Sequence, residues 1–262
     1  MNFFKKNTSL IVTIIGAAVL IAGAIFYHGY QYSQSNQNQD SEVAEKEFEQ
    51  KVEKAIEKYI AKQQEKALKA QEEANKIIQV EGVSVDDDAM LGDPEAAVTI
   101  IEFSDFDCFY CQKYAQETYP LLKKNYINNK KVKYVARDFP LASHPLALQK
   151  ALAAECVREQ SNDETYFAFH HLMFTKKATN QEEILELAQE VGVDAKKVGK
   201  CLAAEKYRAE VEQDLADGKE SGVTGTPAFF INGWFLKGAY PYEKFVEIIE
   251  KELALAQSSQ TD

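Results

Sequence analysis

Cys108 and Cys111 are separated by two residues, a spacing that suits either dithiol–disulfide chemistry or part of a metal site. An apolar segment precedes the pair and a helical pattern follows it, which places the cysteines on the first turn of a helix. There the free N–H groups and the helix dipole favour the thiolate, and such cysteines have pKa values of about 3.5–7.5. A stabilised thiolate favours the reduced pair and makes the disulfide more oxidising. The second cysteine, deeper in the turn, can resolve a mixed disulfide.

Two other uses of this cysteine pair are open. A zinc site needs two further ligands at suitable spacing, and Cys156 and Cys201 stand far apart, each without a neighbouring cysteine. An inert structural disulfide is the other alternative. The strand-to-helix context favours redox chemistry, so we expect no metal and no cofactor beyond a redox-active Cys108–Cys111 disulfide.

The segments around the pair predict an α/β domain. We expect strands at 97–103, 132–138, 227–231 and 234–236, the last two joined by an Asn232–Gly233 hairpin turn. Helices are expected at 112–125 and 242–255 and through a long inserted region at about 143–221, where Asn180 and Asp194 read as N-caps. The order predicts an α/β sandwich with a helical subdomain inserted in its middle.

Two motifs carry a specific resemblance. The sequence Glu102-Phe103-Ser104-x-Phe106-x-Cys108-x-x-Cys111, with Gly222 to Ala228 and Phe230 to Gly233, resembles the DsbA-like, periplasmic disulfide oxidase branch of the thioredoxin superfamily. The resemblance covers roughly residues 81–256. It implies a thioredoxin-like sandwich in which Cys108 is the nucleophile and Cys111 the resolving thiol. It also implies a cis peptide bond before Pro227, which leaves the backbone of Thr226 free to bind a substrate strand beside Cys108.

Further residues gain roles by the same resemblance. Glu102 falls where the family keeps a buried carboxylate, and burial in an apolar strand would raise its pKa and let it shuttle a proton for Cys111. The alternative is a glutamate that faces solvent at the strand end. Cys156 and Cys201 fall where related exported proteins have a structural disulfide between two helices. Two free buried thiols are the alternative.

The dipeptide between the cysteines departs from the family pattern. It is Phe109-Tyr110, which we assign to substrate binding, and it offers no imidazole to the Cys108 thiolate, although the Tyr110 hydroxyl could donate. Asp105 and Asp107 place negative charge nearby, which disfavours a thiolate and argues against strong oxidising power. Another acidic run, Asp86 to Asp88, lacks the spacing of a calcium loop and is expected to be a solvated turn.

The N-terminal 30 residues predict a cytoplasmic tip and a transmembrane anchor. Leu10 to Tyr27 carries no charge and approaches the roughly 20 residues that span a bilayer. Lys5 and Lys6 precede it, so the remaining chain is expected outside the cytoplasm, as a single-pass protein of the cell membrane. A cleaved signal peptide is the alternative, and it exports the chain equally. Exported cysteines lie where disulfides persist.

Residues 31–80 predict a polar tether followed by a charged helix. From Ser41 to about Gln79 the chain lacks Gly and Pro and carries i,i+4 pairs such as Glu47/Lys51 and Glu65/Lys69. A lone helical spacer is favoured over a dimerising coiled coil, because the stripe is mostly Ala and Gln and buries little. The folded domain is expected at 81–257, in a monomer.

Composition and context give the expected function. With 30 basic against 41 acidic residues and a net charge of -11, the chain is unsuited to nucleic acid. We expect a membrane-anchored, extracytoplasmic thiol:disulfide oxidoreductase acting on exported proteins with unpaired cysteines, reoxidised by a quinone-linked membrane partner as the family implies. A reductase or isomerase of the cell envelope, and a non-catalytic binding protein on the same scaffold, are the alternatives.

Overall fold

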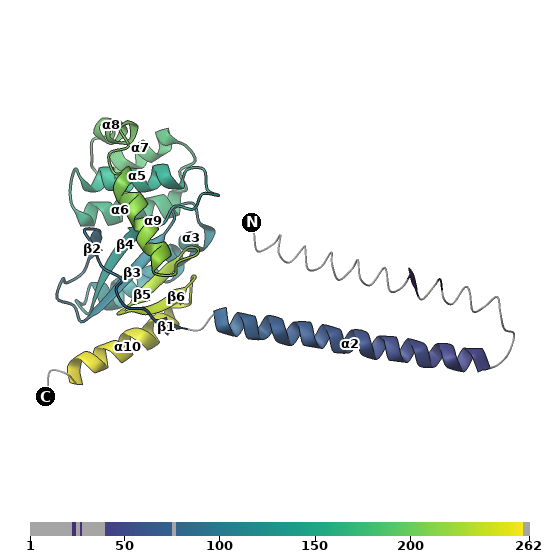
Figure 1. Cartoon of the computed structure of the whole chain (residues 1–262). Helices are drawn as coiled ribbons and strands as arrows, with labels where there is room; N and C mark the ends of the chain where they lie inside the picture. The colour runs from purple at the N-terminus through teal and green to yellow at the C-terminus, as the bar shows by residue number, and fades with distance from the viewer. Residues whose placement is uncertain (1–22, 25–26, 28–39, 75–76, 259–262) are drawn as a thin grey trace. The chain divides into compact units, whose positions relative to one another are not determined.

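The structure is a computed structural model that describes residues 23–24, 27, 40–74 and 77–258. The chain divides into two compact units, Met1–Glu73 and Ala74–Asp262. Helix α2 (Asp40–Ala74) is continuous over 35 residues (Figure 1). Ion pairs join Glu47 to Lys51 and Glu65 to Lys69 along it. The charged helix and these two i,i+4 pairs are therefore confirmed.

Most of the predicted anchor, residues 10–27, and the tether at 31–39 lie outside the described residues. Within the part of the chain that the structure describes, none of the helices combines the length and the apolar character needed to cross a bilayer.

A mixed sheet forms the centre of the second unit. Its strand order, over the described residues, is β1-β6-β5-β3-β4-β2. The strands are β1 (Ile78–Gln79), β2 (Ala89–Leu91), β3 (Val98–Ser104), β4 (Val132–Asp138), β5 (Ala228–Ile231) and β6 (Trp234–Lys237). Strands β3 and β4 are parallel, and the other neighbours are antiparallel. The strand–helix–strand unit and the hairpin at Asn232–Gly233 are confirmed.

The two edge strands differ from the sequence prediction. Ile78 and Gln79, assigned above to the end of the charged helix, form β1 and pair with Phe235 and Trp234. The Val80 N–H continues this contact by donating to the Gly233 carbonyl at 2.8 Å. Strands of two and three residues carry no readable periodicity, and their pairing partners are distant in sequence, so local patterning does not reveal them. The sheet therefore begins before residue 81.

The apolar run of β3 reflects a sheet covered on both faces. Ile100 belongs to a core cluster that also contains Tyr114 of helix α3 (Phe109–Glu117) and Phe245 of helix α10 (Tyr242–Ser258). On the other face, Phe103 packs in a second cluster against which Leu215 of helix α9 (Arg208–Glu220) lies. Figure 1 shows α9 across the strands. Because side chains alternate between faces, Glu102 projects to the same side as Ile100, into the larger cluster.

Helices fill the rest of the unit. They are α3 (Phe109–Glu117), α4 (Tyr119–Leu122), the π-helix η1 (Lys123–Ile127), α5 (Ala147–Arg158), α6 (Asp163–Lys176), α7 (Gln181–Glu190), α8 (Ala195–Ala203), α9 (Arg208–Glu220) and α10 (Tyr242–Ser258). The side chains of Asn180 and Asp194 accept N–H hydrogen bonds at the starts of α7 and α8, which confirms both caps. The helical insert, α5 to α9, thus separates β4 from β5.

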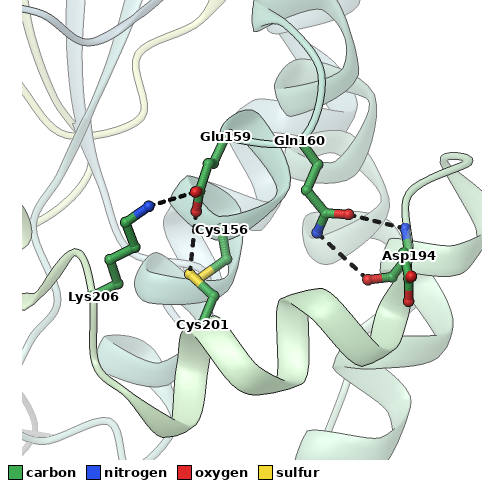
Figure 2. Close-up of a disulfide and its surroundings, with 6 residues drawn as sticks. All are labelled: Cys156, Glu159, Gln160, Asp194, Cys201 and Lys206. Atoms are coloured by element: carbon green, nitrogen blue, oxygen red, sulfur yellow. Dashed lines mark hydrogen bonds and ion pairs between the residues drawn. A yellow bond between two sulfur atoms is a disulfide. The ribbon is translucent and has the colours of Figure 1, made fainter.

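A disulfide between Cys156 on α5 and Cys201 on α8 closes the insert (Figure 2). The two Cα atoms are 5.9 Å apart and 45 residues apart in sequence. Beside it, Gln160 exchanges hydrogen bonds with the Asp194 backbone, which donates at 3.2 Å and accepts at 3.4 Å. The cross-link constrains the unfolded chain and joins α5 to α8 in the folded one.

Candidate active site

The cysteine pair sits where β3 passes into α3. Cys108 is the N-cap of α3, with extended backbone angles, and Cys111 lies one turn further along the helix. Both are thiols, and both are buried, with 6% of Cys108 and none of Cys111 exposed. The first sulfur therefore lies at the positive end of the helix, and the second lies beneath it in the core.

The loop before β5 meets the pair from the other side. The peptide bond between Thr226 and Pro227 is cis. The Cys108 thiol donates to the Thr226 carbonyl oxygen at 3.3 Å. This contact joins residues 118 positions apart and places the backbone of Thr226 against the first sulfur. An extended substrate segment could pair with that backbone while its own cysteine meets Cys108.

The two thiols have pKa values shifted in opposite directions. The hydrogen bond from the Cys111 thiol lowers the pKa of Cys108 to about 6, against a smaller opposing effect of burial. The Thr226 hydroxyl, which is buried and has no other partner among the described residues, lowers it further. Burial, followed by the hydrogen bond to Cys108, raises the pKa of Cys111 well above its ordinary value. Cys108 is thus the thiolate at neutral pH, and Cys111 holds its proton.

Glu102 lies in the core beneath the pair with 1% of its surface exposed. Burial raises the pKa of its carboxyl to about 8, although a hydrogen bond from Tyr134 lowers it. The charge of Glu102 also contributes to the raised pKa of Cys111, so the two groups lie close enough to interact. The alternative of a glutamate facing solvent is wrong, because β3 is covered on both faces. A neutral carboxyl near Cys111 can give a proton to its sulfur.

The fold pairs both aspartates that the sequence places beside Cys108. Asp105 accepts hydrogen bonds at 2.8 Å from the Leu141 N–H and the His144 ring. Asp107 forms an ion pair with Lys150, which is buried. The main causes of the Cys108 pKa shift include neither aspartate. The segment that leads into the insert thus hydrogen-bonds Asp105, and α5 supplies the cation that pairs with Asp107.

Phe109 and Tyr110 lie on the surface beside the first sulfur. Their side chains are 67% and 60% exposed, and the two rings contact each other edge to face, with centroids 5.5 Å apart. An exposed aromatic pair can contact apolar residues around a substrate cysteine. The Tyr110 ring contacts the ring of Phe109. The oxygen atom in contact with the Cys108 sulfur is the backbone carbonyl of Thr226.

Three residues of this region were missed from the sequence. Lys150 lies on the same buried face of α5 as Ala147, Ala151 and Ala154. A single lysine on an otherwise apolar helix face is the sequence signal that could have identified it as a buried partner for an acidic residue. Tyr134 and His144 act across 32 and 39 residues of sequence, through pairings that no local pattern specifies. The arrangement as a whole combines an acidic thiol, a protonated second thiol, a neutral carboxyl and an open backbone. This combination is suited to thiol–disulfide exchange.

Comparison with known proteins agrees with this geometry. A family model described as thioredoxin matches residues 84–251. Disulfide bond formation protein D of Bacillus subtilis is 26% identical over 177 residues, which cover 65% of this chain and 79% of that protein. Na(+)/H(+) antiporter NhaA 3 of Salinispora tropica is 30% identical over 177 residues, which cover 67% of this chain and 26% of the antiporter. The chain thus spans about a quarter of the length of the antiporter relatives it matches.

Solved structures show the same fold. BdbD from Bacillus subtilis, in its oxidised form, superposes with a TM-score of 0.63 at 24% identity, over 69% of this chain and all of that one. The alpha-DsbA1 protein of Wolbachia pipientis gives a TM-score of 0.61 at 23% identity, over 68% and 96% of the two chains. The thioredoxin-like fold with a helical insertion is therefore confirmed. Because the family model covers well over half of its length, this chain belongs to the thioredoxin family.

Proposed function

We propose that this chain is a protein thiol:disulfide oxidoreductase that introduces disulfides into exported proteins. The observation that carries the proposal is the juxtaposition of an acidic Cys108 thiol, a protonated Cys111 thiol and the cis peptide bond before Pro227. Similarity to disulfide bond formation protein D of Bacillus subtilis supports the same activity. The assignments of Cys108, Cys111 and Glu102 as catalytic, and of Thr226, Pro227, Phe109 and Tyr110 as substrate-binding, are parts of this proposal.

The reaction begins with the Cys108–Cys111 disulfide. A substrate thiolate attacks the Cys108 sulfur, the bond to Cys111 breaks, and Cys111 leaves as a thiolate that takes a proton from the neutral Glu102 carboxyl. A second substrate thiolate then attacks the substrate sulfur of the mixed disulfide. Cys108 leaves as a thiolate, and the substrate carries away the new disulfide. Two electrons have passed from the substrate to the cysteine pair.

The direction of the exchange follows from which form the site stabilises. A thiolate at Cys108 is held by the Cys111 thiol and by the start of α3, and these interactions exist only in the reduced pair. A stabilised reduced form makes the disulfide a better oxidant. This favours an oxidase over a reductase or isomerase, and the intact cysteine pair favours both over a non-catalytic binding protein. Return to the disulfide form would need a membrane partner, which we propose to be quinone-linked.

The location proposed for the domain is the outer face of the cell membrane. The predicted anchor at 10–27, preceded by Lys5 and Lys6, is one support. The disulfide between Cys156 and Cys201 is a second, because structural disulfides persist in oxidising compartments. We propose a monomer, with α2 as a spacer between anchor and domain.

Trapping tests the proposed activity. In a Cys111→Ala variant, the Cys108 thiolate should attack disulfides of exported proteins and release one substrate cysteine as a thiolate. The mixed disulfides should accumulate, because the resolving thiol of Cys111 is gone. The measurement is a non-reducing gel of cells treated with a thiol-blocking agent, followed by identification of the captured proteins. A Cys108→Ala variant is the matched control and should capture nothing. Equal, empty lanes for the two variants would contradict exchange and favour the binding protein.

A further inference from the structure

The two oxygens of the buried Glu102 carboxyl have different surroundings. Oε2 forms a hydrogen bond with the Tyr134 hydroxyl, which comes from the neighbouring strand β4 on the same face of the sheet. Oε1 is buried and has no hydrogen-bond partner among the described residues. A buried carboxyl oxygen without a partner is costly, so its retention calls for an explanation. The nearby titrating thiol is that of Cys111, whose pKa the Glu102 charge raises.

A second tyrosine extends the contact on Oε2. The Tyr114 hydroxyl lies 3.1 Å from the Tyr134 hydroxyl, and Tyr114 stands on α3, one turn after Cys111. Burial raises the pKa of both phenols well above its ordinary value, so both keep their hydrogens. Each hydroxyl has one hydrogen to donate. When Tyr114 donates to Tyr134 and Tyr134 donates to Oε2, the acid proton of Glu102 is left on Oε1.

We propose that Tyr134, supported by Tyr114, is a positioning residue that holds Oε2 of Glu102 and leaves Oε1 to exchange a proton with the Cys111 sulfur. The inference rests on the proposed function, in which Glu102 serves Cys111. It adds that the pKa of Glu102 is adjusted by the hydroxyl groups of Tyr134 on β4 and Tyr114 on α3. In the oxidising step, the proton passes from Glu102 to the departing Cys111 thiolate, and the Tyr134 hydroxyl then donates to the carboxylate that remains.

The pH dependence of the first exchange step tests this inference. The oxidised protein is mixed with excess reduced glutathione, quenched with acid and followed by mass spectrometry from pH 5 to 10. The wild-type rate constant is divided by the glutathione thiolate concentration, and it should fall as pH rises and Glu102 loses its proton. Burial raises the pKa of Glu102 to about 8 in the dithiol form, and the fall should lie at or below this value because the disulfide lacks the contributing Cys108 charge. In Tyr134→Phe the carboxylate loses a donor, so this fall should move to higher pH by about one unit.

Matched variants separate this role from packing. Tyr119→Phe removes a buried hydroxyl without a partner among the described residues, from a ring 5.2 Å from that of Tyr134, and should leave the profile unchanged. Tyr114→Phe should move the fall of the rate constant to higher pH by a smaller amount than Tyr134→Phe. This variant replaces Tyr134→Phe in the test if Tyr134→Phe does not fold. Glu102→Gln should abolish the fall.

Two results are distinguishable in the same data. Tyr134→Phe and Tyr114→Phe profiles that superpose on the wild type, while Glu102→Gln loses the fall, would overturn the positioning role and leave the proposed function standing. A wild-type protein that exchanges no disulfide with glutathione would contradict the proposed function itself, and the inference with it.

Discussion

Replacing Cys108 with serine should lower the rate at which the protein oxidises a reduced dithiol peptide by about 10³-fold or more. The reason lies in the position of this sulfur at the start of α3, against the Thr226 carbonyl, with a pKa lowered to about 6. A serine hydroxyl cannot form the mixed disulfide. The measurement is the appearance of oxidised peptide by mass spectrometry. All proteins receive the same oxidant treatment beforehand, which forms the Cys108–Cys111 disulfide wherever both cysteines are present.

The other cysteine pair gives the control for this experiment. A Cys156→Ala/Cys201→Ala variant also loses two sulfurs but retains Cys108 and Cys111, so its rate should stay within about tenfold of wild type at temperatures where it is folded. Retention of the wild-type rate by Cys108→Ser would show that another group carries the exchange.

The largest expected effect on stability is at Arg137, on β4. Its side chain is 1% exposed, and Nε lies 2.9 Å from Asp88 and 2.8 Å from Asp214. Its terminal nitrogen reaches Asp217 at 2.9 Å and Asp86 at 3.3 Å.

The acidic run at 86–88 is therefore more than a solvated turn. The expectation that it is solvated is wrong for Asp88, which is 9% exposed. Carboxylates of Asp86, Asp88 and Asp214 lie within 4.8 Å of one another, with Arg137 among them.

Arg137→Leu should lower the free energy of unfolding by about 3–5 kcal/mol near pH 8, because it leaves the buried carboxyl groups of Asp88 and Asp214 without the guanidinium that contacts them. Burial and then the neighbouring Asp214 raise the pKa of Asp88, and burial raises that of Asp214, in spite of Arg137. The folded state therefore holds protons that the unfolded state releases above about pH 4, and stability falls as pH rises through the folded pKa. Without the guanidinium these pKa values rise further.

Urea unfolding at pH 5 and pH 8 measures this effect. The loss in Arg137→Leu should be larger at pH 8 than at pH 5, because Arg137 lowers the pKa of Asp214 and so favours its ionised form. Asp88, whose pKa is raised to about 10, keeps its proton at both pH values. Arg208→Leu is the matched control: its guanidinium also pairs with two carboxylates, Glu205 and Glu212, but on the surface, where such pairs contribute about 0–1 kcal/mol. Equal losses for the two variants, or a loss independent of pH in Arg137→Leu, would contradict this account.

The fold was predictable where local patterns are strong. An apolar run buried on both faces identified β3, and Asn232–Gly233 identified the hairpin, where both residues have positive φ. The burial of Glu102 followed from the same run, since a strand without a polar face has nowhere exposed to place it. The short strands β1 and β2 were missed, because their existence depends on distant partners.

The chemistry of the site was less predictable than its position. Asp105 and Asp107 read as charges that oppose a thiolate. In the fold, the His144 ring forms a hydrogen bond with Asp105 and Lys150 pairs with Asp107, from segments about 40 residues away. Tyr134 could be assigned to a strand, but its contact with Glu102 depends on the register in which Ile100 pairs with Tyr134. Sequence patterns specify which residues are near the cysteines along the chain, and the fold decides which charges are paired.

The redox potential of the Cys108–Cys111 pair, measured at pH 7 in glutathione buffers, tests the proposed direction of exchange most directly. Its reduced form is stabilised by the Cys108 thiolate, whose pKa is about 6, so the potential should lie above about -200 mV, in the range of oxidants. A Cys156→Ala/Cys201→Ala variant measured in parallel assigns the transition to the Cys108–Cys111 pair. A value near about -270 mV, that of a reductant, would contradict the oxidase.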